Sequence, residues 1–147
     1  KDFEVAFIGS ISDDAKTILK KYDGYYKYYC NVNHNELYKF YSNSSVFILP
    51  SIEEGLAMVI AEAMACGLPV IVTKNTGGEE IVRNGIDGFI IPVRDSEAIK
   101  EKILYFYENE DKRQEMGDSA REYIKKFSWD RYGDEMVKAY KKVLSKR

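Results

Sequence analysis

The sequence predicts an α/β fold with a doubly wound, mostly parallel sheet. Short apolar segments alternate with helical segments along the chain, about five of each, as in folds built from repeated βα units. The clearest unit is the apolar run 46–49, which is followed by a turn and by residues 56–65, all apolar except Glu62. A helix that is apolar all round is typical of a sheet that is covered on both faces.

Each predicted strand is a short run of apolar or aromatic residues that ends at a turn signal. In chain order, these strands are 3–8, 25–30, 46–49, 69–73 and 89–91. Residues 70–72, Val-Ile-Val, predict a strand that is buried on both faces.

Each predicted helix begins at a residue suited to an N-cap or at a glycine. The first predicted helix is capped by Ser12 and has Ile18 and Leu19 on its inner face. A short helix is predicted after Gly77 and Gly78. The other predicted helices are 35–41 after Asn33, 56–66, 96–108, 111–127 and 129–144 after Ser128. Gly67 and Pro69 close the helix 56–66, and Gly117 is the point at which the helix 111–127 could break.

The loops after the second, third and fourth predicted strands gather at one edge of the sheet. Ligands of doubly wound sheets bind outside the carboxyl ends of the strands, which is this edge. The N-terminus of the helix 56–66 offers unpaired N–H groups to an anion, and Gly55 lets a diphosphate come close. Gly77 and Gly78 permit a second close approach from the neighbouring loop. The sequence therefore predicts one ligand crevice.

Glu62 is the anomalous residue of this region. An ionised carboxylate in an apolar helix is costly unless it is paired. Its partner is either a Lys, Arg or backbone amide of the same domain, or a hydroxyl-rich ligand at the helix N-terminus, and the sequence leaves both open. Glu54, in the loop before the helix, is by default a solvated carboxylate.

Composition excludes several classes of protein. We interpret residues 1–147 as a single domain, large enough for a substantial core. A formal net charge of −2 argues against a nucleic-acid binder. Two cysteines are too few for a disulfide framework, and a single histidine, His34, excludes a His-based zinc centre. No apolar run reaches the ~18 residues of a membrane span and no signal peptide opens the chain, so we expect a cytoplasmic protein.

Three nucleotide-binding motifs are missing from the sequence. No G-x-G-x-x-G follows the first strand and no G-x-x-x-x-G-K-[ST] occurs, which argues against an NAD- or flavin-dependent oxidoreductase and a P-loop NTPase. No Asp-x-Asp occurs either, so we predict no metal–diphosphate clamp. We expect metal-independent chemistry without a cofactor, with a phosphate site made of backbone amides.

The stretch 51–70 also resembles a family signature. The matching residues are Ser51, Glu54, Gly55, Glu62, Ala63, Met64, Ala65, Gly67, Pro69 and Val70. Their spacing is similar to the E-x7-E signature of retaining GT-B glycosyltransferases of the group-one family, which use nucleotide-sugar donors. Residues 33–51, 76–82, 84–95 and 127–129 extend the resemblance over most of the chain. The resemblance implies a Rossmann-like domain, the C-terminal donor-binding half of a GT-B fold.

By position, the resemblance implies roles for the two acids and for the glycine-rich loops. Glu54 would be the catalytic residue, facing the hydroxyls of the donor sugar, and Glu62 would bind the ribose. The other residues implied for donor binding are Gly55, Leu56, Ala57, Met58, Gly77 and Gly78.

The sequence departs from the family pattern in two ways. Relatives commonly have Phe-Gly where this chain has Leu56-Ala57, and they begin the domain with a βα unit whose Arg and Lys neutralise the leaving diphosphate. That first βα unit and the acceptor-binding N-terminal domain are not found here. We therefore expect the donor-binding part of an enzyme that transfers a sugar to a sugar or lipid-linked acceptor, and we expect this chain alone to be inactive.

One alternative function stays open at this point. It is a non-transferring nucleotide-sugar domain, either epimerase-like or a silent binding module. The basic tail 138–147 predicts a solvated face, so membrane contact is not indicated, although a peripheral position of the full enzyme stays open.

Overall fold

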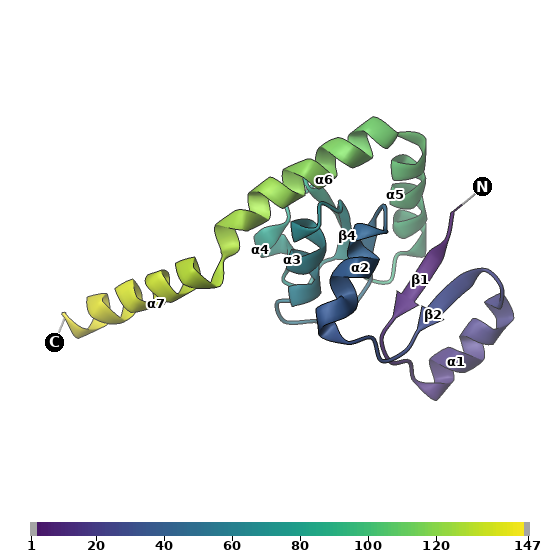
Figure 1. The fold of residues 1–147 in the computed structure, drawn as a ribbon, viewed down its shortest axis with the longest axis horizontal. Coiled ribbons are helices and arrows are strands. Elements are labelled where there is room, and N and C mark those ends of the chain that lie inside the picture. Colours follow the sequence, from purple (N-terminus) through teal and green to yellow (C-terminus); the bar gives the residue numbers. More distant parts are fainter. Residues whose placement is uncertain (1–2, 146–147) are drawn as a thin grey trace. The chain divides into compact units, whose positions relative to one another are not determined.

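Strands and helices alternate along the chain (Figure 1). The structure is a computed structural model that describes residues 3–145, so Lys146 and Arg147 of the basic tail lie outside the described residues. The strands are β1 (Val5–Ile8), β2 (Tyr26–Tyr29), β3 (Phe47–Leu49), β4 (Val70–Thr73) and β5 (Gly88–Ile91). The α-helices are α1 (Asp13–Leu19), α2 (Leu37–Ser42), α3 (Met58–Ala65), α4 (Gly78–Ile81), α5 (Ser96–Glu108), α6 (Glu110–Ile124) and α7 (Trp129–Leu144).

Every strand pair within the described residues is parallel, which confirms the predicted α/β fold class. β1 pairs with β2, while β3, β4 and β5 form a second sheet with β4 at its centre. By its contacts the chain divides into two compact units, Lys1–Lys39 and Phe40–Arg147, and each is described by itself.

The first unit contains the strand pair and α1. Ser12 caps α1 as predicted, because its hydroxyl accepts a hydrogen bond from the Ala15 N–H at 3.2 Å. Ile18 is 59% exposed, so the prediction that it faces inward was wrong. A strand pair of four residues each offers too little apolar surface to cover a helix, and α1 buries none of its residues.

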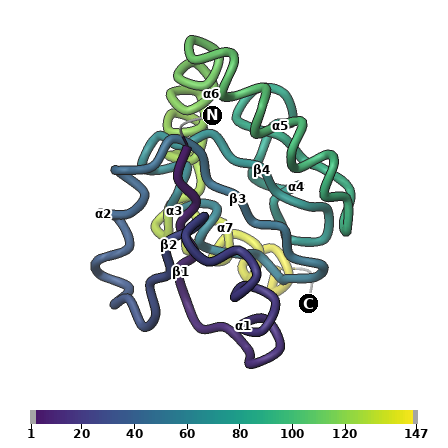
Figure 2. Tube along the Cα trace, turned by 90° about the vertical axis from the view of Figure 1, so that its right-hand side faces the viewer, coloured from purple at the N-terminus to yellow at the C-terminus, as the bar shows by residue number. Residues whose placement is uncertain are grey.

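The second unit is built around β4, which is buried along its whole length. Its successive side chains enter two different layers, as the alternation of a strand requires. Ile71 packs in a cluster with Ile91 of β5, Phe106 of α5 and Met116 of α6. Val72 faces α3 and α4 instead, since a Cβ placed on Gly78 would lie 2.8 Å from Val72 Cγ2 and 3.4 Å from Ile60 Cδ1. Helices thus cover both faces of the sheet, and β3 and β4 run between α3 and α5 in Figure 2.

Two glycines determine how α6 meets the end of α3. Gly67 has a φ of 83° and occupies the C′ position of α3, as predicted. Gly117 does not break its helix, since α6 continues from Glu110 to Ile124. A Cβ on Gly117 would lie 2.2 Å from the Gly67 carbonyl oxygen, so only a glycine lets α6 rest directly on this turn.

The last helix, α7, is capped by Ser128, whose hydroxyl accepts a hydrogen bond from the Arg131 N–H at 3.3 Å. None of its residues is buried. In the part of the chain that the structure describes, no helix has the length and apolar character needed to cross a membrane.

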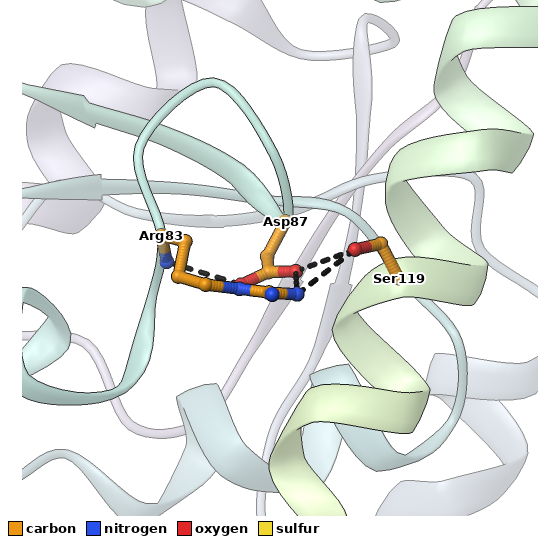
Figure 3. Close-up of polar contacts among 3 residues, drawn as sticks. All are labelled: Arg83, Asp87 and Ser119. Atoms are coloured by element: carbon orange, nitrogen blue, oxygen red, sulfur yellow. Dashed lines mark hydrogen bonds and ion pairs between the residues drawn. The ribbon is translucent and has the colours of Figure 1, made fainter.

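An ion pair within the turn before β5, Arg83–Asp87, is hydrogen-bonded to Ser119 of α6 (Figure 3). The Asp87 carboxylate is fully buried and accepts hydrogen bonds from Arg83 Nη2 at 2.6 Å and Arg83 Nε at 2.8 Å. Ser119 Oγ of α6 donates to the same carboxylate at 2.9 Å. Burial alone would raise the pKa of Asp87, but these hydrogen bonds outweigh it and hold that pKa below the ordinary 3.8.

We expect Asp87→Asn to lower the free energy of unfolding by about 1–3 kcal/mol at neutral pH, because it removes charge-assisted hydrogen bonds from a buried group. A carboxyl whose pKa is lower in the folded state stabilises the fold above its unfolded pKa, and this contribution is lost as the pH falls through the folded pKa. The difference between wild type and variant should therefore shrink as the pH falls below about 3.8. Denaturant unfolding at a series of pH values measures both effects.

The matched control is Glu135→Gln, which removes the charge of an exposed pair with Lys138 on α7. It should change stability by less than about 0.5 kcal/mol. Equal losses in the two variants, or an Asp87→Asn difference that stays constant down to acid pH, would contradict the structural role of the ion pair.

Candidate functional site

The loop between β3 and α3, residues 50–57, contains four of the eight predicted site residues. Glu54, Gly55 and Leu56 are exposed, and a Cβ placed on Gly55 would meet no atom within 4 Å. α3 begins at Met58, two residues later than predicted, since Ala57 is extended (ψ 98°) and serves as the N-cap without a side-chain hydrogen bond. Leu56 and Ala57 therefore belong to the loop, and the open backbone before the helix is longer than expected.

Main-chain hydrogen bonds fasten this loop to the loop that follows β4. The Glu54 N–H donates to the Asn75 carbonyl oxygen at 2.8 Å, and the Ala57 N–H donates to the Thr76 carbonyl oxygen at 3.2 Å. The loops after β3 and β4 therefore converge at one edge of the sheet, as predicted. The loop after β2 was predicted at the same edge, but β2 pairs with β1 in the other sheet, so that loop does not extend from this one. The Ala57 N–H, however, already has a protein acceptor, which leaves the amides of Gly55, Leu56 and Met58 as backbone candidates for a ligand.

Two buried threonines hold the ends of the strands together. The Thr73 hydroxyl, at the end of β4, lies within hydrogen-bonding distance of the carbonyl oxygens of Leu49, the last residue of β3, and of Ser51 just beyond it. The Thr76 hydroxyl donates to the Thr73 carbonyl oxygen at 2.8 Å, which closes the turn after β4. Both residues are at most 1% exposed. Buried hydroxyls bonded to main-chain carbonyls fix the loops without competition from water.

The two predicted glycines lie in different surroundings. Gly77 has a φ of 69°, and a Cβ there would lie 2.7 Å from Leu56 Cα and 2.8 Å from the Gly55 carbonyl oxygen. Gly77 therefore touches the backbone of the first loop. Gly78 is buried against Val72, so its lack of a side chain serves the packing of α4 on the sheet.

Glu62 is half-buried on α3, and one of its partners is a phenol. Tyr41 Oη, at the end of α2, donates to Glu62 Oε2 at 3.2 Å. This protein partner is therefore neither the cation nor the backbone amide that the sequence suggested. Burial, together with the neighbouring Glu62 carboxylate, raises the pKa of the Tyr41 phenol, which keeps it protonated as a donor.

Carboxylates outnumber cations in this part of the chain. Residues 40–82 contain five carboxylates and a single basic residue, Lys74. Lys74 follows β4 directly and is exposed. Within residues 3–145, no group of three or more His, Cys, Asp and Glu side chains is arranged to hold a metal ion.

Three of the side chains that shape the site were not predicted: Tyr41, Thr73 and Thr76. A threonine at the end of an otherwise apolar, buried strand indicates a hydrogen bond from its side chain to the backbone, so the role of Thr73 could have been predicted from the sequence. Nothing in the sequence connects Tyr41 with Glu62, which lies 21 residues away in the chain.

The structure is thus an α/β protein with an exposed, hydrogen-bonded loop at the carboxyl ends of two parallel strands, the edge at which such sheets bind ligands. Sequence comparison then supplies the family. The model of the family described as glycosyl transferases group 1 matches residues 3–123, and the chain belongs to this family.

Individual relatives and solved structures are similar over most of the chain. An uncharacterized glycosyltransferase of Methanocaldococcus jannaschii is 37% identical over 109 residues, which cover 74% of this chain and 31% of that protein. A glycosyltransferase from Rickettsia africae has a TM-score of 0.85 at 25% identity, over 98% of this chain and 41% of that one. HepE of Anabaena, solved with UDP and glucose, has a TM-score of 0.81 at 18% identity, over 93% of this chain and 40% of that one.

These matches confirm that the fold is that of the C-terminal half of GT-B glycosyltransferases. The chain spans about a third of the length of the archaeal relative.

Gly77→Ala tests the contact between the two loops. The left-handed φ alone costs an alanine about 1–2 kcal/mol. Gly85, with a φ of 79° and no atom within 4 Å of an added Cβ, is the matched control because Gly85→Ala carries only this cost. We expect Gly77→Ala to lose at least about 1 kcal/mol more unfolding free energy than Gly85→Ala, since its Cβ meets the Leu56 backbone. Equal losses in denaturant unfolding would show that the loops are not in contact.

Proposed function

We propose that this chain is the donor-binding part of a retaining glycosyltransferase that takes its sugar from a nucleotide-diphosphate sugar. The observation that carries the proposal is the segment 53–58, in which every residue except Ala57 is exposed. Main-chain hydrogen bonds hold it at the N-terminus of the helix that carries Glu62, in a chain of the group 1 family. UDP and glucose bound in HepE support a nucleotide-sugar ligand. The retaining stereochemistry rests on the E-x7-E resemblance of Glu54 and Glu62.

The diphosphate binds to the backbone amides of Gly55, Leu56 and Met58. These amides lie at the N-terminus of α3, where the peptide dipoles favour negative charge. Ala57 contributes by holding the loop, because its N–H donates to Thr76. The absence of a side chain at Gly55 leaves room for the ligand.

Gly77 and Gly78 contribute from the second loop. Gly77 brings its backbone against Gly55, so the main chain of this turn lies next to the diphosphate and the sugar. Gly78 keeps α4 seated on β4, which holds that turn in place.

Glu62 binds the ribose. A carboxylate has about four lone-pair positions, so the bond from Tyr41 to Oε2 leaves it able to accept hydrogen bonds from the two ribose hydroxyls. Tyr41 positions the carboxylate for this contact. Glu54, which is exposed one residue before Gly55, accepts hydrogen bonds from hydroxyls of the donor sugar.

The donor site requires neither a metal ion nor the protein that holds the acceptor. The donor binds without a metal, since backbone amides replace a metal–diphosphate clamp. The acceptor, a sugar or lipid-linked sugar, is held by protein outside these 147 residues, so the chain alone binds donor and transfers no sugar. The protein acts in the cytoplasm.

Calorimetric titration of the chain with UDP, GDP and ADP in the presence of EDTA tests the proposal. We expect one of the three to bind, and we expect Glu62→Ala to weaken that binding by about 1–3 kcal/mol. Tyr41→Phe, which keeps the Glu62 carboxylate, should weaken nucleotide binding by less than Glu62→Ala does. Added Mg²⁺ should change the affinity by less than tenfold, about 1.4 kcal/mol.

Two results would refute the donor site: no binding of any of the three nucleotides, or a folded Glu62→Ala chain with unchanged affinity. A Glu62→Ala variant that only loses stability would identify Glu62 as a structural residue paired with Tyr41.

Glu54→Gln tests the sugar contact separately from the nucleotide contact. We expect the affinity for the nucleotide sugar to fall by about 0.5–1.5 kcal/mol while the affinity for the nucleoside diphosphate stays the same, because only the sugar reaches this carboxylate. Glu53→Gln is the matched control, an exposed carboxylate one residue earlier. If Glu53→Gln and Glu54→Gln behave alike, or if Glu54→Gln weakens both ligands equally, Glu54 does not contact the sugar.

A further inference from the structure

We propose that Lys74 binds an oxyanion of the donor, either an oxygen of the diphosphate or the carboxylate of an acidic sugar. This inference rests on the proposed function, and it adds a side chain that the signature residues do not include. It follows from the position of the Lys74 backbone, from the absence of an ion pair to its ammonium group among the described residues, and from the charges around it.

The backbone of Lys74 is fixed on two sides. Its N–H donates to the Ile91 carbonyl oxygen at the end of β5, at 3.0 Å. The next residue, Asn75, accepts the Glu54 N–H at 2.8 Å through its carbonyl oxygen. Lys74 is therefore held at the carboxyl edge of the sheet, one residue from the contact with the loop that contains Gly55.

The charge of Lys74 is not neutralised by the protein. Within residues 3–145, Lys74 takes part in no ion pair, although four exposed carboxylates lie nearby in the sequence: Glu53 and Glu54 in the facing loop, and Glu79 and Glu80 in α4. Three lysines of the helices, Lys100, Lys112 and Lys138, each pair with a glutamate three residues away. The ammonium group of Lys74 is thus available to a ligand.

The carboxylates near Lys74 in the sequence make its positive charge important for binding a diphosphate. A diphosphate brings negative charge into a region, residues 40–82, that already has five carboxylates. The N-terminus of α3 supplies the equivalent of only about half a positive charge. A lysine carries a full charge and three donors on a flexible stem, which suits an oxyanion whose position varies. Lys74 is the one basic residue in that range, so it is the side chain able to offset the repulsion.

The experiment compares three variants of the 147-residue chain by calorimetry. Lys74→Met keeps the length of the side chain without its charge, and Lys74→Arg keeps the charge. Lys141→Met is the matched control, an exposed lysine on α7. The probes are the nucleoside, the nucleoside diphosphate, its hexose and its hexuronate, with the base that the nucleotide titrations select. For uracil these are uridine, UDP, UDP-glucose and UDP-glucuronate.

We expect Lys74→Met to bind the nucleoside as wild type does and to bind UDP about tenfold more weakly if the diphosphate is the partner. A loss confined to UDP-glucuronate assigns Lys74 to the carboxylate of an acidic sugar. Lys74→Arg should stay within about threefold of wild type in either case, because the charge remains. Lys141→Met should match wild type for every probe.

The inference is overturned if Lys74→Met binds all four probes like wild type, if it weakens the nucleoside as much as UDP, or if Lys141→Met causes the same loss. In these cases wild-type binding still supports the donor site, so the inference fails alone. If the wild-type chain binds no nucleoside diphosphate, the proposed function and the role of Lys74 fail together.

Discussion

The hydrogen bonds of Thr73 and Thr76 hold the carboxyl ends of β3 and β4 together, and the arrangement of the whole site depends on them. Thr73 ties the end of β4 to carbonyls at the end of β3 and just beyond it, and Thr76 closes the turn that follows. The main-chain bonds between the two loops are accepted by Asn75 and Thr76, which belong to this turn. A helix N-terminus is a weak attraction for an anion when it moves, and it becomes a specific one when its amides are preorganised. The buried β4 beneath these bonds supplies the rigidity.

Asp87 and Glu62, two of the carboxylates of the second unit, have different environments. Asp87 is fully enclosed, and a guanidinium, a backbone N–H and a hydroxyl all donate to it. Its charge is balanced inside the protein, so it acts only on the packing of the turn and α6. Glu62 is half-buried, and the neutral phenol of Tyr41 is one of its partners, so its hydrogen bond fixes the carboxylate on the side of α2.

The sequence predicted the elements that local signals define and missed those that distant contacts define. Caps at Ser12 and Ser128 and the glycine at Gly67 were readable because each acts within its own turn. The start of α3 moved to Met58 because the Ala57 N–H bonds to Thr76, a residue in another loop. The unbroken helix at Gly117 likewise depends on its contact with Gly67. For the candidate site, the signature residues could be grouped from sequence, whereas the roles of Tyr41 and Thr76 required the fold.

The bonds that fasten the loop 53–58 come from main-chain atoms, and this has an evolutionary consequence. Every residue except proline supplies the N–H that positions 54 and 57 use, and every residue supplies the carbonyl that positions 75 and 76 use. Exposed side chains such as Leu56 and Met58 can therefore change without moving the frame that carries them. For the proposed donor site, single substitutions at these two positions would change the surface offered to the sugar while the hydrogen bonds of the loop stay in place, so a change of donor would not require a change of fold.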